Sequence, residues 1–326
     1  MSATRAVEIG LNAAIIAIVE NGPAILRIPG GEDGLDGLPF GPFNPVRHRT
    51  MELGLRQWVQ EQTGLKLGYV EQLYTFGDRG RHRQAGDNEL HVVSVGYLAL
   101  TRLKDDHEVK LQRSGASWKD CYHYLPWEDW RGGRPAVIDE FILPKLEAWI
   151  AERDTKNLAG LQAVDPRGRN RVRIAFGLDG MPWDEERVLD RYELIYSAGM
   201  VEEAVADGRV EAVRGKHALG NAMLHDHRRI LATALSRLRA KLKYRPVIFE
   251  LMASEFTLLE LQQTAESILG RKVHKQNFRR LVESNQLVEP TGRTSTSTGG
   301  RPAALFKFRR EVMAERPAPG LRLGRG

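Results

Sequence analysis

Polar and basic side chains share one face of a short helix that the sequence predicts over residues 274–284. Their spacings of one, three and four residues place them on one side of an α-helix, while apolar residues fall on the other side. The polar face consists of Lys275, Gln276, Arg279 and Arg280. A helix about 10–12 Å across fits a major groove about 12 Å wide, where such side chains reach base edges and phosphates. This face therefore predicts recognition of duplex DNA.

The residues around this helix predict the other parts of a winged helix-turn-helix. Thr257 and Glu260 have the spacing of a capping box, and Gly270 marks the end of the helix that they begin. After the second helix, apolar strands expected at 287–290 and 303–308 flank a loop rich in Ser, Thr and Gly. Helix, tight turn, helix and two-stranded ribbon follow one another in the order of this DNA-binding fold.

Two roles are predicted for the polar side chains of this unit. The expected base readers, whose groups can pair with base edges, are Gln276, Asn277 and Arg280. The cations assigned to phosphates are Lys272, Lys275, Arg279, Arg293 and Arg301. The alternative is a small helical subdomain with a solvated basic face.

Charge is distributed unevenly along the 326 residues. Residues 225–310 contain 17 Lys and Arg against 7 Asp and Glu, a net charge of +10. The whole chain carries +6 and residues 311–326 add +1, so residues 1–224 carry −5. Lys and Arg that neutralise phosphates release counterions, so the basic end favours a polyanion as its partner. On charge alone, a solvated basic surface is the alternative.

Two features predict a cytoplasmic protein that does not enter the membrane. The apolar run over residues 11–19 follows Glu8 rather than a basic cluster and ends in a turn signal, so it predicts a strand rather than a signal peptide or a span. Cys121 is the single cysteine, which excludes an intrachain disulfide and cannot form a zinc site by itself.

The first 103 residues predict an α+β unit, whereas residues 104–224 contain no chemical motif. In the first unit, strands are expected over 13–19, 24–28 and 90–100, and a helix over 51–62. In the second segment, amphipathic helices are expected over 138–150 and 185–206, and a connection over 208–220.

A helix predicted over residues 226–243 joins these segments to the DNA-binding unit. Four leucines recur along it at spacings of four, three and four residues, so one stripe of this helix must be buried. They are Leu231, Leu235, Leu238 and Leu242. The stripe could pack on its own domain or form a seam between two protomers, since the spacing is that of a and d positions. In either case the helix is a candidate lever between the two ends of the chain.

Several motifs resemble the Nudix-related transcriptional regulators of NAD metabolism. Those in the C-terminal part are Tyr244-Arg-Pro-Val-Ile-Phe-Glu-Leu-Met252, Glu255-Phe-Thr-Leu-Leu-Glu-Leu-Gln262, Asn277-Phe-Arg-Arg280, Glu289-Pro-Thr-Gly292 and Gly300-Arg-Pro-Ala-Ala304. Those in the first hundred residues are Gln62-Thr-Gly-Leu65, Leu73-Tyr-Thr-Phe-Gly-Asp78 and Val92-Val-Ser-Val-Gly-Tyr97. The chain is most similar to the longer, repressor-type members that control NAD synthesis genes, because residues 104–224 exceed what a plain Nudix domain needs.

The resemblance implies a fold, a domain division and partners. The fold is α+β: a Nudix-like mixed-sheet α/β/α domain with a helical insertion, followed by a winged helix-turn-helix. The sensing domain would cover 1–224, with its core at about 1–103 and an extension at 104–224, and the linker helix and DNA-binding domain would cover 225–326. The implied partners are double-stranded, palindromic operator DNA, a second copy in a homodimer, and an adenine nucleotide effector, which is ATP, NAD or ADP-ribose. No cofactor is required.

The Nudix box itself departs from the pattern of active members. With Gly64 as its final glycine, the positions of conserved carboxylates hold Arg49, Trp58 and Gln62, and only Glu61 is acidic. Active members bind Mg²⁺ through those carboxylates, so we expect no metal and no enzymatic activity here. The alternatives are an active Nudix pyrophosphohydrolase with an appended DNA-binding domain and an architectural DNA binder that needs no ligand.

Arginines near the degenerate box could hold phosphates in place of a metal, because a guanidinium can bind phosphate oxygens in a bidentate manner. The candidates, in two loops expected beside one cleft, are Arg47, Arg49, Arg79, Arg81 and Arg83. Phe40 or Phe43 is expected to stack on the adenine. The alternative is that both loops carry exposed charge without a ligand.

Overall fold

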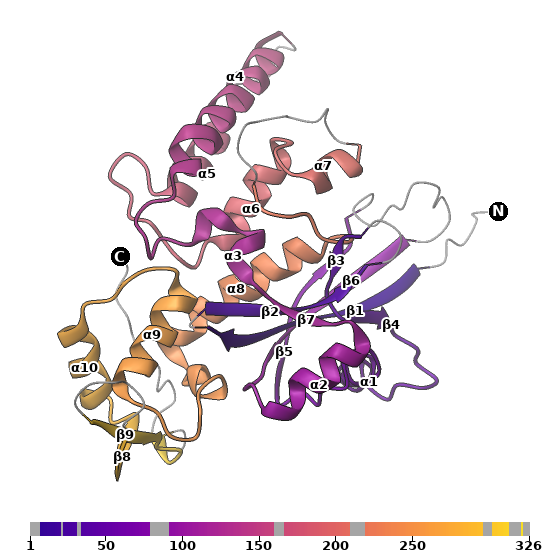
Figure 1. Cartoon of the computed structure of the whole chain (residues 1–326). Coiled ribbons are helices and arrows are strands. Elements are labelled where there is room, and N and C mark those ends of the chain that lie inside the picture. Colours follow the sequence, from indigo (N-terminus) through magenta and orange to yellow (C-terminus); the bar gives the residue numbers. More distant parts are fainter. Residues whose placement is uncertain are drawn as a thin grey trace.

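The structure is a computed structural model that describes residues 7–20, 22–30, 34–78, 91–159, 166–208, 219–295, 302–312 and 321. Its centre is a mixed sheet with helices on both faces, and the winged helix lies at one end (Figure 1). None of the described helices combines the length and the apolar character needed to cross a bilayer.

Strand β1 is a central strand of the sheet, since it pairs with three other strands. It runs parallel to β6 and antiparallel to β2 and β4, while β5 pairs with β6 and β7 with β2. The bounds are β1 Val7–Val19, β2 Gly22–Pro29, β3 Asp36–Gly37, β4 Phe40–Pro42, β5 Tyr69–Phe76, β6 His91–Leu100 and β7 Ser117–Asp120. Because β7 pairs with β2, the sheet extends past residue 103, the limit that the sequence suggested for the core.

Side chains of β1 alternate between two buried layers, as the two-residue period of a strand requires. Leu11 and Ile15 pack with Leu55 of α1 (Met51–Thr63), next to which lies α2 (Asp105–Ser114). Ile16 packs on the opposite face, in the cluster that contains α8 (His227–Tyr244). The predicted α/β/α arrangement is therefore confirmed, with α8 as the layer that covers the second face.

Helix α8 is fixed in the interior of a single chain. All four leucines of its stripe have an exposed fraction of 0%, so the alternative of a seam between protomers is wrong for them. The imidazole of His227 is hydrogen-bonded to Asn12 Oδ1 (2.9 Å) and accepts from the Leu38 backbone N–H (3.0 Å). The helix therefore packs as part of the N-terminal unit as well as forming the connection, and its role as a lever stays a prediction.

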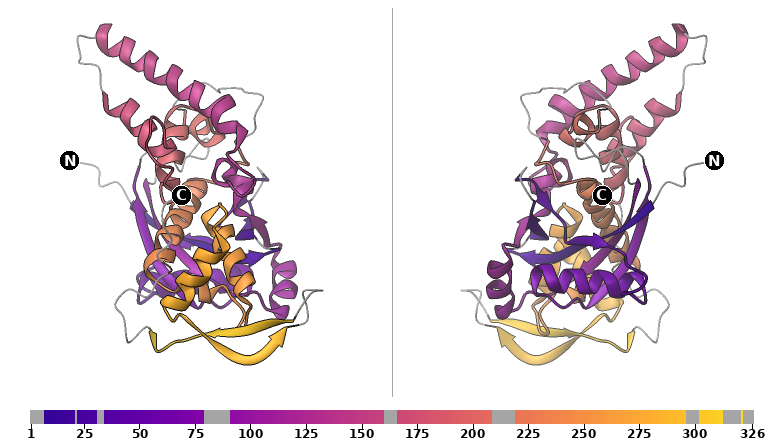
Figure 2. Two further views of the ribbon diagram at one scale, coloured as in Figure 1. Left: turned by 90° about the vertical axis from the view of Figure 1, so that its left-hand side faces the viewer. Right: turned by 90° about the vertical axis from the view of Figure 1, so that its right-hand side faces the viewer.

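The segment between β7 and α8 is a helical insertion, as predicted. Its helices are α3 Cys121–Tyr124, α4 Leu143–Ala159, α5 Pro166–Phe176, α6 Val188–Ser197 and α7 Glu202–Ala206. The single helix expected over 185–206 is two helices, because Gly199 at φ +71° separates α6 from α7. The helix expected over 138–150 begins with a π-helical turn at Ile138–Ile142 and continues to the end of α4. Figure 2 shows α4 projecting at the end of the molecule opposite the wing.

The C-terminal unit has the predicted order of elements. The bounds are α9 Leu258–Leu269, α10 Lys275–Ser284, β8 Val288–Ser295 and β9 Ala303–Phe308. The Thr257–Glu260 capping box is present, and Gly270 ends α9 in the left-handed region at φ +70°. Strand β8 extends five residues past the predicted end at Pro290, so the ribbon of the wing is longer than the sequence indicated.

A fully buried ion cluster joins the insertion, α8 and the end of α9. Glu128 forms ion pairs with Arg191 (2.6 Å) and Arg239 (2.6 Å), and all three side chains have an exposed fraction of 0%. Arg239 also donates to the backbone carbonyl of Ile268 (2.8 Å), at the C-terminal end of α9. A Cβ at Gly270 would lie 2.2 Å from the Glu128 carbonyl oxygen, so only glycine fits there. The turn that precedes α10 is thereby held against the insertion.

Candidate nucleic-acid interface and nucleotide pocket

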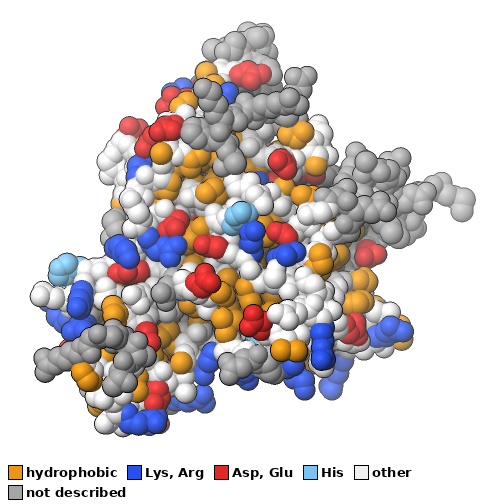
Figure 3. Space-filling model, in the orientation of Figure 1, with side chains coloured by type: hydrophobic (Ala, Val, Ile, Leu, Met, Phe, Trp, Pro, Cys, Tyr) orange, Lys and Arg blue, Asp and Glu red, His pale blue; other side chains and the backbone are white. Residues whose placement is uncertain are grey.

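Helix α10 presents its polar face to solvent, as the sequence predicts. Phe278 and Val282 are buried (1% and 0% exposed) and attach the helix to the core. The described site residues on the opposite face are all exposed: Lys275, Gln276, Asn277, Arg279 and Arg280. Asn277 Oδ1 and the Arg280 guanidinium lie 3.5 Å apart, so these two candidate base readers are neighbours. Lys and Arg side chains also gather at the lower left of the face in Figure 3, over the winged helix.

Two of the cations assigned to phosphates pair with carboxylates of the same chain. Lys272 lies 3.3 Å from Glu266, and the guanidinium of Arg293, in β8, forms an ion pair with Glu255. Both cations are more than half exposed, so contact with a phosphate would have to compete with these pairs. Arg301 lies outside the described residues.

The turn between α9 and α10 is held by polar groups that sequence reasoning missed. Glu266 accepts from the Val273 backbone N–H (3.0 Å) and from Gln262 Nε2 (3.0 Å), and Gln262 Nε2 also donates to the Val273 carbonyl (3.2 Å). Burial alone would raise the pKa of Glu266, but these hydrogen bonds and Lys272 lower it. The spacing of four residues between Gln262 and Glu266 on an otherwise apolar face was the available signal.

Two side chains at the carboxylate positions of the Nudix box bind the neighbouring strand β4. The Gln62 amide accepts from the Phe40 N–H (3.0 Å) and donates to the Phe40 carbonyl (2.7 Å). The Trp58 indole N–H donates to the Pro42 carbonyl (3.0 Å), and its ring packs so closely on Gly41 that a Cβ there would lie 2.3 Å away. This face of α1 is therefore occupied by protein backbone.

Only some of the candidate nucleotide-binding residues are among the residues that the structure describes. Arg47 and Arg49 are exposed on the loop before α1, and Phe43 on the same loop lies 5.9 Å from the His48 ring. Phe40, in β4, is half-buried with its ring 5.2 Å from that of His227. Arg79, Arg81 and Arg83 lie outside the described residues. The structure thus brings Arg47, Arg49 and Phe43 onto one loop, and their role stays a prediction.

Within the part of the chain that the structure describes, no three His, Cys, Asp or Glu side chains lie close enough to hold a metal ion. Glu61, the acidic residue that remains in the box, accepts a hydrogen bond from the Gln57 amide (2.7 Å) on the exposed side of α1.

Replacing Gln62 with alanine tests the role of this amide. The Gln62→Ala variant loses both hydrogen bonds to Phe40, so we expect its free energy of unfolding to fall by about 1–3 kcal/mol in a urea titration. Gln57→Ala is the matched control on the same helix, since it loses only an exposed bond and should change stability by less than about 0.5 kcal/mol. Equal free energies of unfolding for the two variants would contradict the role of the Gln62 amide in holding β4.

Comparison with known families and structures supports both halves of this arrangement. A family model described as the NrtR DNA-binding winged helix domain matches residues 248–308. The Acinetobacter baylyi protein named "ADPR responsive transcriptional repressor NtrR" is 38% identical over 98 residues, which are 30% of this chain and 39% of that relative.

Solved structures with a similar fold cover nearly the whole chain at low sequence identity. Shewanella oneidensis NrtR in complex with a 27mer DNA has a TM-score of 0.55 at 19% identity, with 94% of this chain and 95% of that chain covered. A MutT/nudix family protein from Enterococcus faecalis has a TM-score of 0.51 at 15% identity, with 95% and 89% covered.

Fold and site together define a protein with a Nudix-like sheet and a C-terminal winged helix. More specifically, residues 248–308 match the family described as the NrtR DNA-binding winged helix domain, and the chain shares the overall fold of Shewanella oneidensis NrtR. The predicted resemblance to the Nudix-related regulators is thereby confirmed.

Proposed function

We propose that the chain is a transcriptional regulator that binds operator DNA through α10 and the β8–β9 wing and represses genes of NAD synthesis. The observation that carries this proposal is the exposed polar face of α10, whose opposite face is buried through Phe278 and Val282. Amide and guanidinium groups on such a helix can read base edges in a major groove. The family match over residues 248–308 supports the same role.

We further propose that an adenine nucleotide controls this binding from the N-terminal unit. The name of the Acinetobacter relative favours ADP-ribose over ATP and NAD as the first effector to test. Trp58 and Gln62 use the carboxylate positions of the box to hold β4, which supports binding without hydrolysis. A ligand changes DNA affinity only if it binds the two arrangements of the protein unequally, and such coupling is typically about 1–3 kcal/mol.

The proposed assembly is a homodimer in the cytoplasm that binds a palindromic operator. Two recognition helices related by a two-fold axis would enter half-sites about 34 Å apart. The leucine stripe of α8 is not available for this dimer, because it is buried within one chain. The dimer surface therefore lies elsewhere.

Fluorescence anisotropy of a labelled duplex tests the DNA-binding proposal. A protein that makes about six or more phosphate contacts loses about 10³-fold or more in affinity between 50 and 200 mM salt, so a steep decrease is expected. Addition of ADP-ribose at fixed salt should change the affinity by about 5- to 150-fold.

The same titration with a small acidic globular protein in place of the duplex is the control for non-specific basic binding. Duplex affinity that is negligible at 50 mM salt, or that does not respond to salt, would contradict the proposal. Salt-dependent binding that ignores ADP-ribose, ATP and NAD would instead favour an architectural DNA binder.

A further inference from the structure

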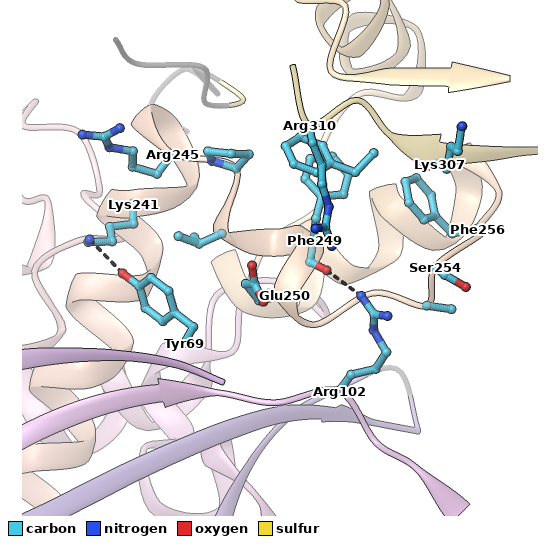
Figure 4. Close-up of a pocket in the computed structure, with 14 residues that line it drawn as sticks. Tyr69, Arg102, Lys241, Arg245, Phe249, Glu250, Ser254, Phe256, Lys307 and Arg310 are labelled. Atoms are coloured by element: carbon cyan, nitrogen blue, oxygen red, sulfur yellow. Dashed lines mark hydrogen bonds between the residues drawn. The ribbon is translucent and has the colours of Figure 1, made fainter. Parts of the chain in front are cut away.

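A pocket separate from the α1 region lies between the sheet and the winged helix. Its volume is about 850 Å³, within the range of about 300–1,000 Å³ that is usual for small-molecule sites. The walls come from the ends of β5, β6 and α8, from the segment before α9, and from β9 with the residue Arg310 beyond it. Figure 4 shows the residues that line it.

Two guanidinium groups reach into this pocket from opposite walls. Arg102 follows β6 in the sheet, and Arg310 follows β9 in the wing; their side chains approach Phe249 from the two sides (Figure 4). Arg102 donates to the Phe249 carbonyl (3.1 Å), and no other hydrogen bond of its guanidinium is formed within the described ranges. Arg310 is exposed and has no carboxylate partner among the described residues. A guanidinium has five N–H donors, so most of this donor capacity is available to a ligand.

The rest of the wall offers complementary chemistry. Phe249 and Phe308 stack with ring centroids 4.2 Å apart and form an apolar part of the pocket wall, in which Phe249 is buried and Phe308 is half-buried. The exposed carboxylate of Glu250 is a lining acceptor that no ion pair of the described chain occupies. Carboxylates in nucleotide sites accept hydrogen bonds from ribose hydroxyls.

We propose that this pocket binds a nucleotide-type ligand. Arg102 and Arg310 hold its phosphates, the phenylalanine wall contacts its base, and Glu250 accepts from its hydroxyl or amino groups. Because planar guanidinium forks bind phosphate oxygens in a bidentate manner, one phosphate group can join both arginines. The ligand would then link the sheet to the wing and favour the domain arrangement in which the two arginines converge.

Isothermal titration of the full chain, without DNA, tests the site. The probes are inorganic pyrophosphate, which has phosphates only, and ADP-ribose, which adds a base and ribose. We expect Arg102→Ala and Arg310→Ala each to weaken pyrophosphate binding at least tenfold. Arg113→Ala, at an exposed arginine of α2 outside the pocket, is the matched control and should leave it unchanged.

The Glu250→Gln variant distinguishes a pocket that recognises the hydroxyl groups of a nucleotide from a pocket that only attracts anions. Loss of the carboxylate charge should strengthen the binding of pyrophosphate and weaken the binding of ADP-ribose, because only ADP-ribose has hydroxyl groups that donate to the Glu250 carboxylate. Thermal unfolding without ligand checks the fold, and Arg102→Lys and Arg310→Lys, which keep the charge but lose the fork, should give intermediate affinities.

The proposal would be overturned if neither alanine variant lost a binding event that the wild type shows with pyrophosphate or ADP-ribose, since the site proposed in the N-terminal unit contains neither arginine. So would a loss confined to duplex DNA in an anisotropy titration, since the pocket would then contact the operator backbone. Because the calorimetry contains no DNA, its failure leaves the proposed regulator function intact, and failure of DNA binding leaves this site intact.

Discussion

We expect the double variant Arg279→Ala/Arg280→Ala to lose affinity for operator DNA by about 30-fold or more. Each arginine that contacts a base or a phosphate contributes about 1–3 kcal/mol, and about 1.4 kcal/mol corresponds to a tenfold change. Both side chains are exposed, and alanine is the best helix former, so α10 itself should remain folded. Anisotropy titrations at fixed salt give the ratio of dissociation constants directly.

The single variants distinguish the predicted roles of these two residues. Arg280→Ala should also reduce discrimination between operator and a scrambled duplex, because Arg280 is assigned to bases. Arg279→Ala should weaken both duplexes alike and lower the slope of log affinity against log salt by about one. Arg113→Ala, exposed on α2, is the control and should bind as wild type. Undiminished binding by the double variant, with nucleotide binding retained, would remove α10 as the DNA reader.

The second large effect is expected at Glu128, where an isosteric change removes one buried charge. Glu128→Gln leaves Arg191 and Arg239 without their shared carboxylate, in positions where both have an exposed fraction of 0%. Removal of one partner from a buried ion pair typically costs about 3–5 kcal/mol, because the remaining charge stays desolvated. We expect the free energy of unfolding from a urea titration to fall by about that amount.

Asp129→Asn is the matched control one residue away. Asp129 pairs with Arg131 (2.8 Å), but both side chains are about a quarter exposed, and such pairs contribute at most about 1 kcal/mol. Equal stabilities of Glu128→Gln and Asp129→Asn would show that the buried cluster does not stabilise the fold.

Lowering the pH should reduce the free energy of unfolding of the wild type more than that of Glu128→Gln. Burial by itself would raise the pKa of Glu128, but Arg191 and Arg239 outweigh it and lower the pKa from its ordinary value of 4.5. A carboxylate with a depressed pKa in the folded state stabilises the protein above its unfolded pKa and loses this contribution as the pH falls. The stability gap between wild type and Glu128→Gln should therefore narrow below about pH 4.5.

The Glu128 cluster also predicts that the insertion affects DNA binding through the position of α10. Arg239 connects Glu128 to the Ile268 carbonyl at the end of α9, and the Trp130 N–H donates to the Gly270 carbonyl (2.6 Å). The turn before the recognition helix thus contacts a segment that lies more than a hundred residues earlier in the chain. At urea concentrations where Glu128→Gln is still folded, a reduced operator affinity would show that this contact orients α10.

The sequence by itself determined the parts of this protein that depend on neighbouring residues. Thr257, Glu260 and Gly270 predicted both ends of α9, and the spacing of Phe278 and Val282 predicted the buried face of α10. Capping hydrogen bonds and helical periodicity act over three or four residues, so they can be recognised in the sequence. The basic character of this end followed from composition alone.

Tertiary structure alone decided which layers those elements join. The leucines of α8 required burial, but only the packed sheet shows that their partner is in the same chain. Glu128 forms an ion pair with Arg239, and Arg102 lies opposite Arg310 in the pocket. In both cases the two residues are far apart in the sequence, and the local sequence patterns do not predict that they come together. Such contacts arise when separate elements pack together, and each depends on the whole path of the chain between its two residues.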